Sequence, residues 1–414
     1  MIQGFPSAIE LHLMSSGGTF KDQANFSTWQ YPYILKMAAA PVIDSFFVKR
    51  IGKNKTYILA SGIAIFVMLL LFGADTKDLI KRHQSTTLGL RWFMLNFSSI
   101  FFQIATEAWQ LSLLGPQLRQ AGSVMINCGL SVGIFIAFNI FVPLNSKEWI
   151  NKYFFYDKPL KEPLMAYEDM TLIMAFTTII ITLYIYFFVA ESCLDDDSQK
   201  FSISQFFDFL LKMNQNANVK LFCFYLFMTT AFSSLVSDSL DLEFIEHGMN
   251  RTTLVNITTF ITPLSIFISF LTFLIIKKGV LLKYYHIASA FGIVLMIWQY
   301  RILKVFEKSD VVDNNLMMSL GMLKLFGTLG DFAGIFWYGY MAGFVQDHIG
   351  ATAITFFTSV MNFSQSIPVT IGFYLADFVE DFGTLVVTVL IFAGLVLVLT
   401  WNLAVSLDEK EPER

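Results

Sequence analysis

Charged side chains inside long apolar stretches are the residues of this sequence that could do chemistry. They are Glu10, Lys36, Glu107, Lys324 and Asp331. A charge at the centre of a membrane helix costs at least about 2.5 kcal/mol, so such residues face a bundle interior or a wet cavity and indicate a functional site. An ammonium group there can bind an anion, and a carboxylate can neutralise an ammonium group. Lys324 and Asp331 share one helical face, which suits either a structural ion pair or contact with a solute.

The elements that must position these charges are membrane helices. Of 414 residues, 55% are hydrophobic and only 14% are charged, and the mean hydropathy is +0.59. Soluble domains carry roughly 25% charged residues, which excludes a soluble enzyme. Backbone amides in hydrocarbon must bond within their own segment, which favours helices. With about 20 residues per span, the chain accommodates about twelve spans. We therefore predict an all-α membrane protein.

The apolar runs of the sequence give the expected positions of the spans. Clear runs cover residues 56–73, 88–108, 124–144, 172–190, 221–236, 254–276, 286–303, 316–344, 351–375 and 385–405, and weaker ones cover 2–14 and 26–43. The first run is too short to cross a core about 30 Å thick at a rise of about 1.5 Å per residue. We expect either a shortened first helix or a chain that starts inside it.

A polar stretch at residues 191–220 divides the runs into two sets. We expect residues 1–190 and 221–405 to form two six-helix halves, joined by a cytosolic central loop at 191–220 and followed by a cytosolic tail at 406–414. The two further acidic residues Asp238 and Asp241 stand at the end of the seventh run. The acidic triplet 195–197 reads as a solvated surface.

Charge balance and the spacing of ligand residues argue against other classes of protein. The net charge is −4, from 28 basic and 32 acidic residues, without the basic concentration that nucleic acid requires. Three cysteines lie far apart and five histidines are scattered singly. We therefore expect no disulfide framework and no metal site. We also expect no cofactor and, for a transport step that needs no nucleophile, no catalytic residue.

The segment after the second run predicts an ionic latch. An acidic residue at a helix end, a glycine turn and a basic cluster occur there, as they do in the loop between spans two and three of major facilitator transporters, where the loop stabilises one alternating-access state. In this chain eight positions separate the acid from the glycine. The latch residues are Asp44, Lys49, Arg50, Gly52, Lys53 and Lys55.

Four ordered stretches resemble the acetyl-coenzyme A transporters, a branch of the major facilitator superfamily. Residues 3–6 are similar to the family's Gln-Gly-Ile-Pro, and residues 36–53 to its Lys-x-x-x-Ala-Pro-Leu-Val-Asp series with the basic turn. Residues 103–109 are similar to its Asp-Ile-Ala-Val-Asp-Gly-Trp, and residues 349–377 carry its Ile-Gly-Gly-Thr, Asn, Pro and Asp elements. In departures from the family, Gln103 and Glu107 replace aspartates and Pro116 replaces an arginine.

The resemblance implies a major facilitator bundle that transports acetyl-coenzyme A from the cytosol to the endoplasmic reticulum lumen by alternating access. The chain would be a multi-pass protein of that membrane, although the plasma membrane or another organelle and a homodimer remain open. A cavity for coenzyme A should supply cations and stacking aromatic rings. The candidate transport residues are Glu10, Lys36, Arg91, Gln103, Glu107, Trp109, Lys324, Asp331, Trp337, Tyr340 and Asn362.

Two other functions stay open at this point. One is transport of a different anionic, nucleotide-like or peptide-like solute. The other is a membrane-bound acyltransferase, which needs a histidine base with a partner inside the bundle. His286 opens an apolar run beside two tyrosines, a position that fits an interfacial residue better than a base.

Overall fold

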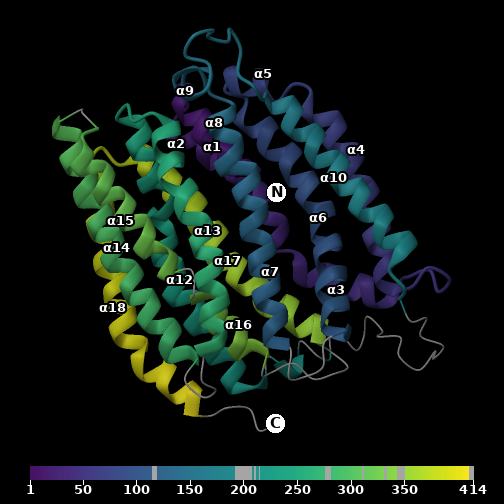
Figure 1. Cartoon of the computed structure of the whole chain (residues 1–414). Coiled ribbons are helices and arrows are strands. Elements are labelled where there is room, and N and C mark those ends of the chain that lie inside the picture. Colours follow the sequence, from purple (N-terminus) through teal and green to yellow (C-terminus); the bar gives the residue numbers. More distant parts are fainter. Residues whose placement is uncertain are drawn as a thin grey trace.

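The computed structural model describes residues 1–113, 119–191, 208, 211–213, 215–275, 281–309, 312–330, 333–342 and 350–409. All regular elements in these ranges are helical (Figure 1). The first set comprises α1 (Phe5–Ser15), α2 (Phe20–Phe26), the 3-10 segment η1 (Ser27–Tyr33), α3 (Lys36–Ser45), α4 (Lys53–Gly73), α5 (Thr76–Lys81), α6 (Ser85–Leu113), α7 (Arg119–Ile134), the π-helical segment η3 (Phe135–Ile140), α8 (Phe141–Leu144), α9 (Lys147–Tyr153) and α10 (Tyr167–Phe188). The second set comprises α12 (Ala217–Glu246), α13 (Arg251–Ile275), α14 (Leu281–Ser309), α15 (Asn314–Gly330), α16 (Ala333–Ala342), α17 (Gly350–Phe378) and α18 (Phe382–Glu409).

Each expected apolar run coincides with a helix or a series of helices, which confirms the all-helical prediction for the described residues. The run at 26–43 is broken into η1 and α3, and the described parts of the run at 316–344 belong to α15 and α16. The last helix, α18, continues to Glu409 and so takes in part of the tail expected at 406–414. Most of the central loop expected at 191–220 lies outside the described residues.

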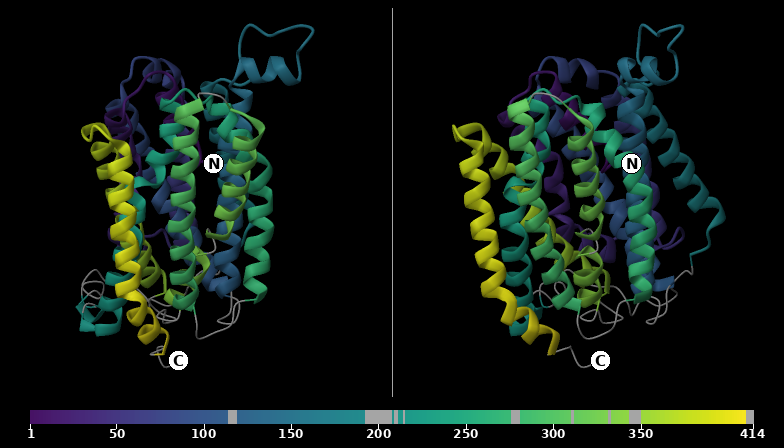
Figure 2. Two further views of the ribbon diagram at one scale, coloured as in Figure 1. Left: turned by 90° about the vertical axis from the view of Figure 1, so that its left-hand side faces the viewer. Right: turned by 60° about the vertical axis from the view of Figure 1, so that its left-hand side comes forward.

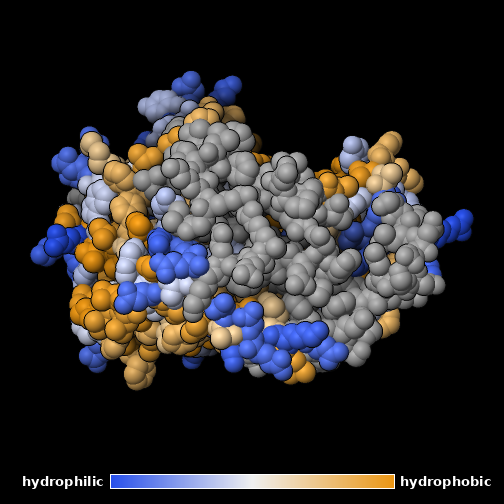
Figure 3. All heavy atoms as spheres, turned by 90° about the horizontal axis from the view of Figure 1, so that it is seen from below, coloured by the Kyte–Doolittle hydropathy of each residue, from blue (hydrophilic) through white to orange (hydrophobic). Residues whose placement is uncertain are grey.

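By length and composition, five helices of the described chain can cross a membrane, namely α4, α10, α12, α14 and α18. The pair Cys128–Leu144 and Lys147–Tyr153, bent by 80°, is a sixth candidate if it counts as one span. Large apolar side chains such as Phe188 on α10 and Leu399 on α18 are 76% and 79% exposed. Exposed apolar surface of this extent suits contact with lipid. In Figure 3 hydrophobic atoms accordingly occupy much of the left-hand edge of the described surface.

The helices pack in two groups with others between them. Helix α4 packs against α6 and α10, and α12 and α14 both pack against α18. In Figures 1 and 2 these two groups stand on opposite sides of the molecule, and α7, α13, α16 and α17 lie between them. Helices α12 and α17 make close contact because Gly372 has no side chain, and a Cβ there would collide with the Leu235 carbonyl.

The N-terminal ends of α4 and α14 are capped in the same way, each by the carboxylate of an acidic residue far away in the sequence. At the start of α4, the Glu191 carboxylate accepts hydrogen bonds from the backbone N–H groups of Asn54 and Lys55 at 3.0 Å each. At the start of α14, Asp408 accepts from the N–H groups of Leu282 and Lys283 at 3.0 and 2.9 Å. Each acid satisfies helix N–H groups that have no partner within the helix and complements the helix dipole.

Helix α17 joins the second set of helices to the first through a row of polar contacts. The row follows one face of α17 along α2, η1 and α3, as expected for residues spaced by about one or two helical turns. Its contacts are Met37 N to Ser359 Oγ at 2.9 Å, Asn362 Nδ2 to the Tyr33 carbonyl at 3.1 Å, Ser27 Oγ to Thr370 Oγ1 at 2.6 Å, and Lys21 N to Asp377 Oδ1 at 3.1 Å.

Helix α13 makes the corresponding contact with η3 and α8. Asn139, in the π-helical segment, donates from Nδ2 to Thr258 Oγ1 at 2.7 Å. Arg251 at the start of α13 donates to Asn145 Oδ1 at 3.2 Å. Single π-helical turns inside α-helices are frequent at functional sites. The two sets of helices therefore meet along two lines of polar contacts.

Candidate functional site

A cavity of about 780 Å³ lies between the two sets of helices. Small-molecule sites are typically about 300–1,000 Å³, so its size fits an organic solute. Its lining combines η1, α3, α6 and α7 with α12, α14, α15, α16 and α17. The sequence-predicted residues Lys36, Gln103, Glu107, Lys324, Trp337 and Asn362 all line it.

The first charged group of the cavity is a nearly dry ion pair. The Lys36 ammonium on α3 donates to both carboxylate oxygens of Glu107 on α6, at 2.9 Å each. Gln103, one turn earlier on α6, donates from Nε2 to Glu107 Oε1 at 2.9 Å. The side chains of Lys36 and Glu107 are 3% and 10% exposed. Because burial of either charge alone is costly, the two residues depend on each other.

The second charged group lies among helices of the other set and is wetter. Lys324 on α15 donates to both oxygens of Asp241 on α12, at 2.7 and 2.8 Å. Gln299 on α14 donates to the same carboxylate at 2.7 Å. The side chains of Lys324 and Asp241 are 23% and 43% exposed. Each ammonium group is thus neutralised by a carboxylate from its own set of helices.

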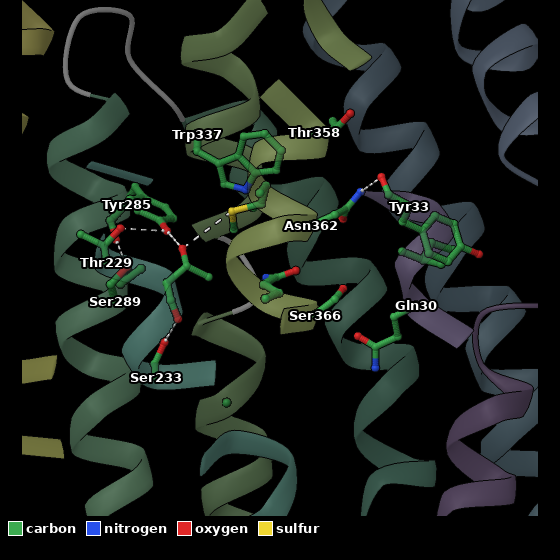
Figure 4. Close-up of a pocket in the computed structure, with 18 of the residues that line it drawn as sticks. Gln30, Tyr33, Thr229, Ser233, Tyr285, Ser289, Trp337, Thr358, Asn362 and Ser366 are labelled. Carbon is green, nitrogen blue, oxygen red and sulfur yellow. Dashed lines mark hydrogen bonds between the residues drawn. The ribbon is translucent and has the colours of Figure 1, made fainter. Parts of the chain in front are cut away.

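Hydroxyl groups on α12 and α14 form a polar wall of the cavity that the sequence reasoning missed (Figure 4). Thr230 and Tyr285 share a hydrogen bond of 2.9 Å. Thr229 and Ser233 are spaced by four residues on α12, and Tyr285 and Ser289 by four on α14. That one-turn spacing of polar residues inside an apolar run is the signal that could have identified them.

The opposite part of the cavity carries amide and aromatic groups. Asn362 on α17 and Gln30 and Tyr33 on η1 appear there in Figure 4, with Trp337 of α16 above the Thr229 to Ser289 hydroxyls. Trp337 is 8% exposed and borders the cavity with its ring. The cavity therefore offers cations, hydroxyl groups, amides and an aromatic surface to one solute.

Four predicted transport residues lie elsewhere in the structure, outside the cavity lining. Glu10 on α1 accepts a 3.0 Å hydrogen bond from the indole of Trp29, so it lies directly behind a residue that lines the cavity. Trp109 packs in a separate cluster between α4 and α6. Tyr340 donates to the Leu407 carbonyl at 3.0 Å and packs against other aromatic rings.

Arg91 belongs to a pair near the end of the bundle. Its guanidinium donates to Asp75 Oδ2 at 3.1 Å, and its charge lies 5.5 Å from the centre of the Phe72 ring. Hydrogen bonding to Arg91 holds the pKa of Asp75 below its ordinary value. Arg91 thus orders the connection from α4 to α6. Asp331, also predicted, lies outside the described residues.

The basic loop predicted as a latch meets an acid that the sequence reasoning did not select. Glu191 accepts from Asn54 Nδ2 at 2.8 Å as well as from the two N–H groups at the start of α4. Gly52 has a φ of 106°, and a Cβ there would collide with the Glu191 carboxylate. Lys55 donates to the Tyr186 carbonyl at 3.2 Å. The side chain of Asp44, the expected acid, lies outside the described residues.

His286, the histidine weighed as an acyltransferase base, is buried among the helices. It is 5% exposed and shares a 3.1 Å hydrogen bond with the Tyr225 hydroxyl. Its ring packs edge-on against Trp401 of α18. It is buried because α12 and α18 cover the start of α14. His286 is not among the residues that line the cavity.

Solved structures share this architecture. The chain matches the human organic anion transporter MFSD10 (TETRAN) with a TM-score of 0.61 and 12% identity, over 97% of this chain and 88% of that one. It matches the Escherichia coli fucose:proton symporter FucP with a TM-score of 0.52 and 12% identity, over 98% and 99% of the two chains. The fold is therefore that of the major facilitator transporters, as the sequence predicted.

The sequence comparisons identify the family more closely. Residues 2–201 match the family model described as Acetyl-coenzyme A transporter 1. Over these residues the chain is similar to the acetyl-coenzyme A transporter family, in agreement with the resemblance found in the sequence.

Two yeast proteins of undescribed function are also similar to the chain. An uncharacterised protein of Schizosaccharomyces pombe is 27% identical over 193 residues, covering 45% of this chain and 37% of that protein. An uncharacterised membrane protein of Saccharomyces cerevisiae is 29% identical over 190 residues, covering 42% of this chain and 34% of that protein. The matched segments thus span about a third of the length of these curated relatives.

Proposed function

We propose that the chain is a secondary transporter that moves acetyl-coenzyme A from the cytosol into the endoplasmic reticulum lumen by alternating access. The observation that carries this proposal is the cavity with one lysine from each set of helices, Lys36 and Lys324. Lysine binds phosphate as a point charge. Coenzyme A bears several phosphate groups, and the similarity of residues 2–201 to the acetyl-coenzyme A transporter family supports this solute.

The two ion pairs allow the transporter to change between its alternating-access states both without and with a bound solute. In the empty carrier, Glu107 neutralises Lys36 and Asp241 neutralises Lys324. Each of the two lysines then keeps its charge compensated within its own set of helices when the halves rock against each other. A phosphate group competes with these carboxylates for the ammonium groups. A solute that reaches both lysines binds the two halves together, so its binding energy depends on their relative position.

The remaining groups of the cavity suit the uncharged parts of the same solute. The indole of Trp337 can stack on a base, and the hydroxyl groups around Tyr285 can hydrogen-bond to ribose or amide groups. We also propose that the loop from Lys49 to Lys55 controls the cytosolic side. The capping of α4 by Glu191 supports this role because it fixes the direction in which the loop leaves the helix.

Uptake into proteoliposomes tests the proposal. The purified chain should accumulate labelled acetyl-coenzyme A, and Lys36→Gln and Lys324→Gln should each lower uptake per amount of folded protein in the vesicles. Lys81→Gln is the matched control, because Lys81 lies on α5 and is not among the residues lining the cavity. Equal uptake by both cavity variants and the control would exclude the lysines from the site.

A competition panel in the same assay separates the alternative solutes. An excess of unlabelled nucleotide or peptide that abolishes uptake would identify another anionic solute as the substrate. Resistance to both, with competition by coenzyme A thioesters, supports the proposed substrate. Fractionation of cell membranes with a tagged chain tests the endoplasmic reticulum location.

A further inference from the structure

A cluster of metal-ligating side chains lies at the ends of α12 and α14, apart from the cavity. Glu243 is in the last turn of α12, His247 follows that helix directly, and Glu307 is in the last turn of α14. Each residue presents one nitrogen or oxygen atom, and these three atoms lie within 4.8 Å of one another. His247 Nε2 is 3.7 Å from Glu307 Oε1, and His247 Nδ1 is 3.8 Å from Glu243 Oε1.

One oxygen of this cluster lacks the partner that its burial requires. Glu243 is 6% exposed, and its Oε2 atom is buried without a hydrogen-bond partner among the described residues. A buried carboxylate without enough partners is expensive. A cation bound between the three side chains would supply the missing interaction.

The histidine is already oriented as a ligand. Its Nδ1 atom lies 3.0 Å from the backbone carbonyl of Glu243, the geometry of an N–H donor to that oxygen. With the proton on Nδ1, Nε2 keeps its lone pair and faces Glu307. Metal-binding histidines characteristically donate their second ring nitrogen to a carbonyl or carboxylate, which fixes the tautomer.

We propose that Glu243, His247 and Glu307 bind one zinc ion. An imidazole with carboxylates suits zinc, whereas calcium and magnesium prefer oxygen ligands alone. Tetrahedral ligands about 2.0–2.2 Å from the metal lie about 3.4 Å apart, so the three atoms must close by at most about 1.4 Å, which side-chain rotation can supply. The side chains of His247 and Glu307 are 34% and 19% exposed, so an ion and a water ligand can enter from solvent.

Lys304 contacts the cluster, and changing it should affect zinc binding in the opposite direction from changing a ligand. Its ammonium group donates to both oxygens of Glu307, at 3.0 and 2.7 Å. A zinc ion must take one of these oxygens, so the lysine competes with the metal both for the ligand and by charge. Removing Lys304 should therefore strengthen zinc binding, whereas removing a ligand should weaken it.

The experiment measures zinc binding by the full chain in detergent, after removal of metal, in competition with a fluorescent zinc chelator. The wild type should bind one equivalent. His247→Ala and Glu307→Gln should weaken binding beyond the roughly 10-fold to 100-fold cost of losing an outer-shell partner. Lys304→Met should tighten it severalfold. Glu246→Gln is the matched control, since Glu246 is exposed at the same helix end but does not belong to the cluster.

The variants are restricted to His247 and Glu307, because these two partly exposed ligands can be changed without disturbing the buried interior around Glu243. Size-exclusion chromatography verifies that each variant is folded. A wild type without a saturable zinc equivalent, a His247→Ala variant that binds like the wild type, or weaker binding by Lys304→Met would overturn the proposal. Displacement of zinc by calcium at equal concentration would overturn the choice of metal. None of these results depends on transport.

Discussion

The ion pair between Lys36 and Glu107 allows its roles in folding and in transport to be separated. Lys36→Met leaves the Glu107 carboxylate, 10% exposed, with the Gln103 amide as its described hydrogen-bond donor. Removing one partner of a buried pair costs about 3–5 kcal/mol. At about 2 °C per kcal/mol or somewhat less in a chain of this length, the apparent unfolding temperature should fall by roughly 5–10 °C.

The double variant Lys36→Met with Glu107→Gln should recover most of this loss. Glutamine has the shape of glutamate and no charge, and neutral replacements of a buried pair are often neutral or stabilising. Uptake should nevertheless stay low, because the ammonium group that meets the anion is gone. A charge-assisted hydrogen bond contributes about 1.5–3 kcal/mol, which corresponds to a roughly 10-fold to 150-fold loss of apparent affinity.

The assay pairs thermal unfolding in detergent with the concentration dependence of acetyl-coenzyme A uptake. A double variant that regains both stability and uptake would refute the reasoning, since Lys36 would then serve only to neutralise Glu107. A double variant as unstable as the single one would show that the pair is not the structural unit that its contacts indicate.

Other changes test other parts of the structure. Glu191→Ala removes the acceptor for the N–H groups at the start of α4 and should lower stability by about 1–3 kcal/mol, measured as a lower apparent unfolding temperature. Tyr285→Phe removes the hydroxyl that bonds to Thr230 and should raise the KM for uptake by up to about tenfold without altering folding; an unchanged KM would remove this hydroxyl from the site. Asn250 and Asn54 both begin glycosylation sequons. In the expected topology only Asn250 is lumenal, so mass spectrometry should find a glycan on Asn250 and none on Asn54. A glycan on Asn54 alone would show that the topology is the opposite of the expected one.

The helices could be predicted from sequence because backbone N–H and C=O groups in hydrocarbon must be hydrogen-bonded within the protein. Long apolar runs must form helices, and the runs at 56–73 and 385–405 correspond to α4 and α18 with shifts of a few residues at the ends. The break between η1 and α3 was not foreseen, since the run at 26–43 shows no charge before Lys36. Pro32 lies inside η1 and has no backbone N–H for an α-helical bond, so the local sequence contributes to the break, and η1 also packs against α6 and α17.

The residues that line the cavity could be predicted in part, and residue chemistry explains which of them were identified. Lys36 and Lys324 were identifiable because a lysine in a span needs a wet or charged environment. Trp109 and Tyr340 were expected beside the same solute but pack away from the cavity. An aromatic ring is stable in lipid, in a packed interior or against a ligand, so its residue type does not indicate which of these surrounds it.

The sequence by itself determined that the chain is a helical membrane protein, which family it resembles and which side chains must leave the lipid. Those conclusions depend on the free energy of transferring each residue into hydrocarbon, a property of the residue and its near neighbours. Only the tertiary structure decided that Glu191 caps α4 and that Asp241 faces Lys324. It likewise brought Glu307 to His247 across 60 residues of chain. Such pairings depend on the rotation and approach of helices far apart in sequence, which local composition does not encode.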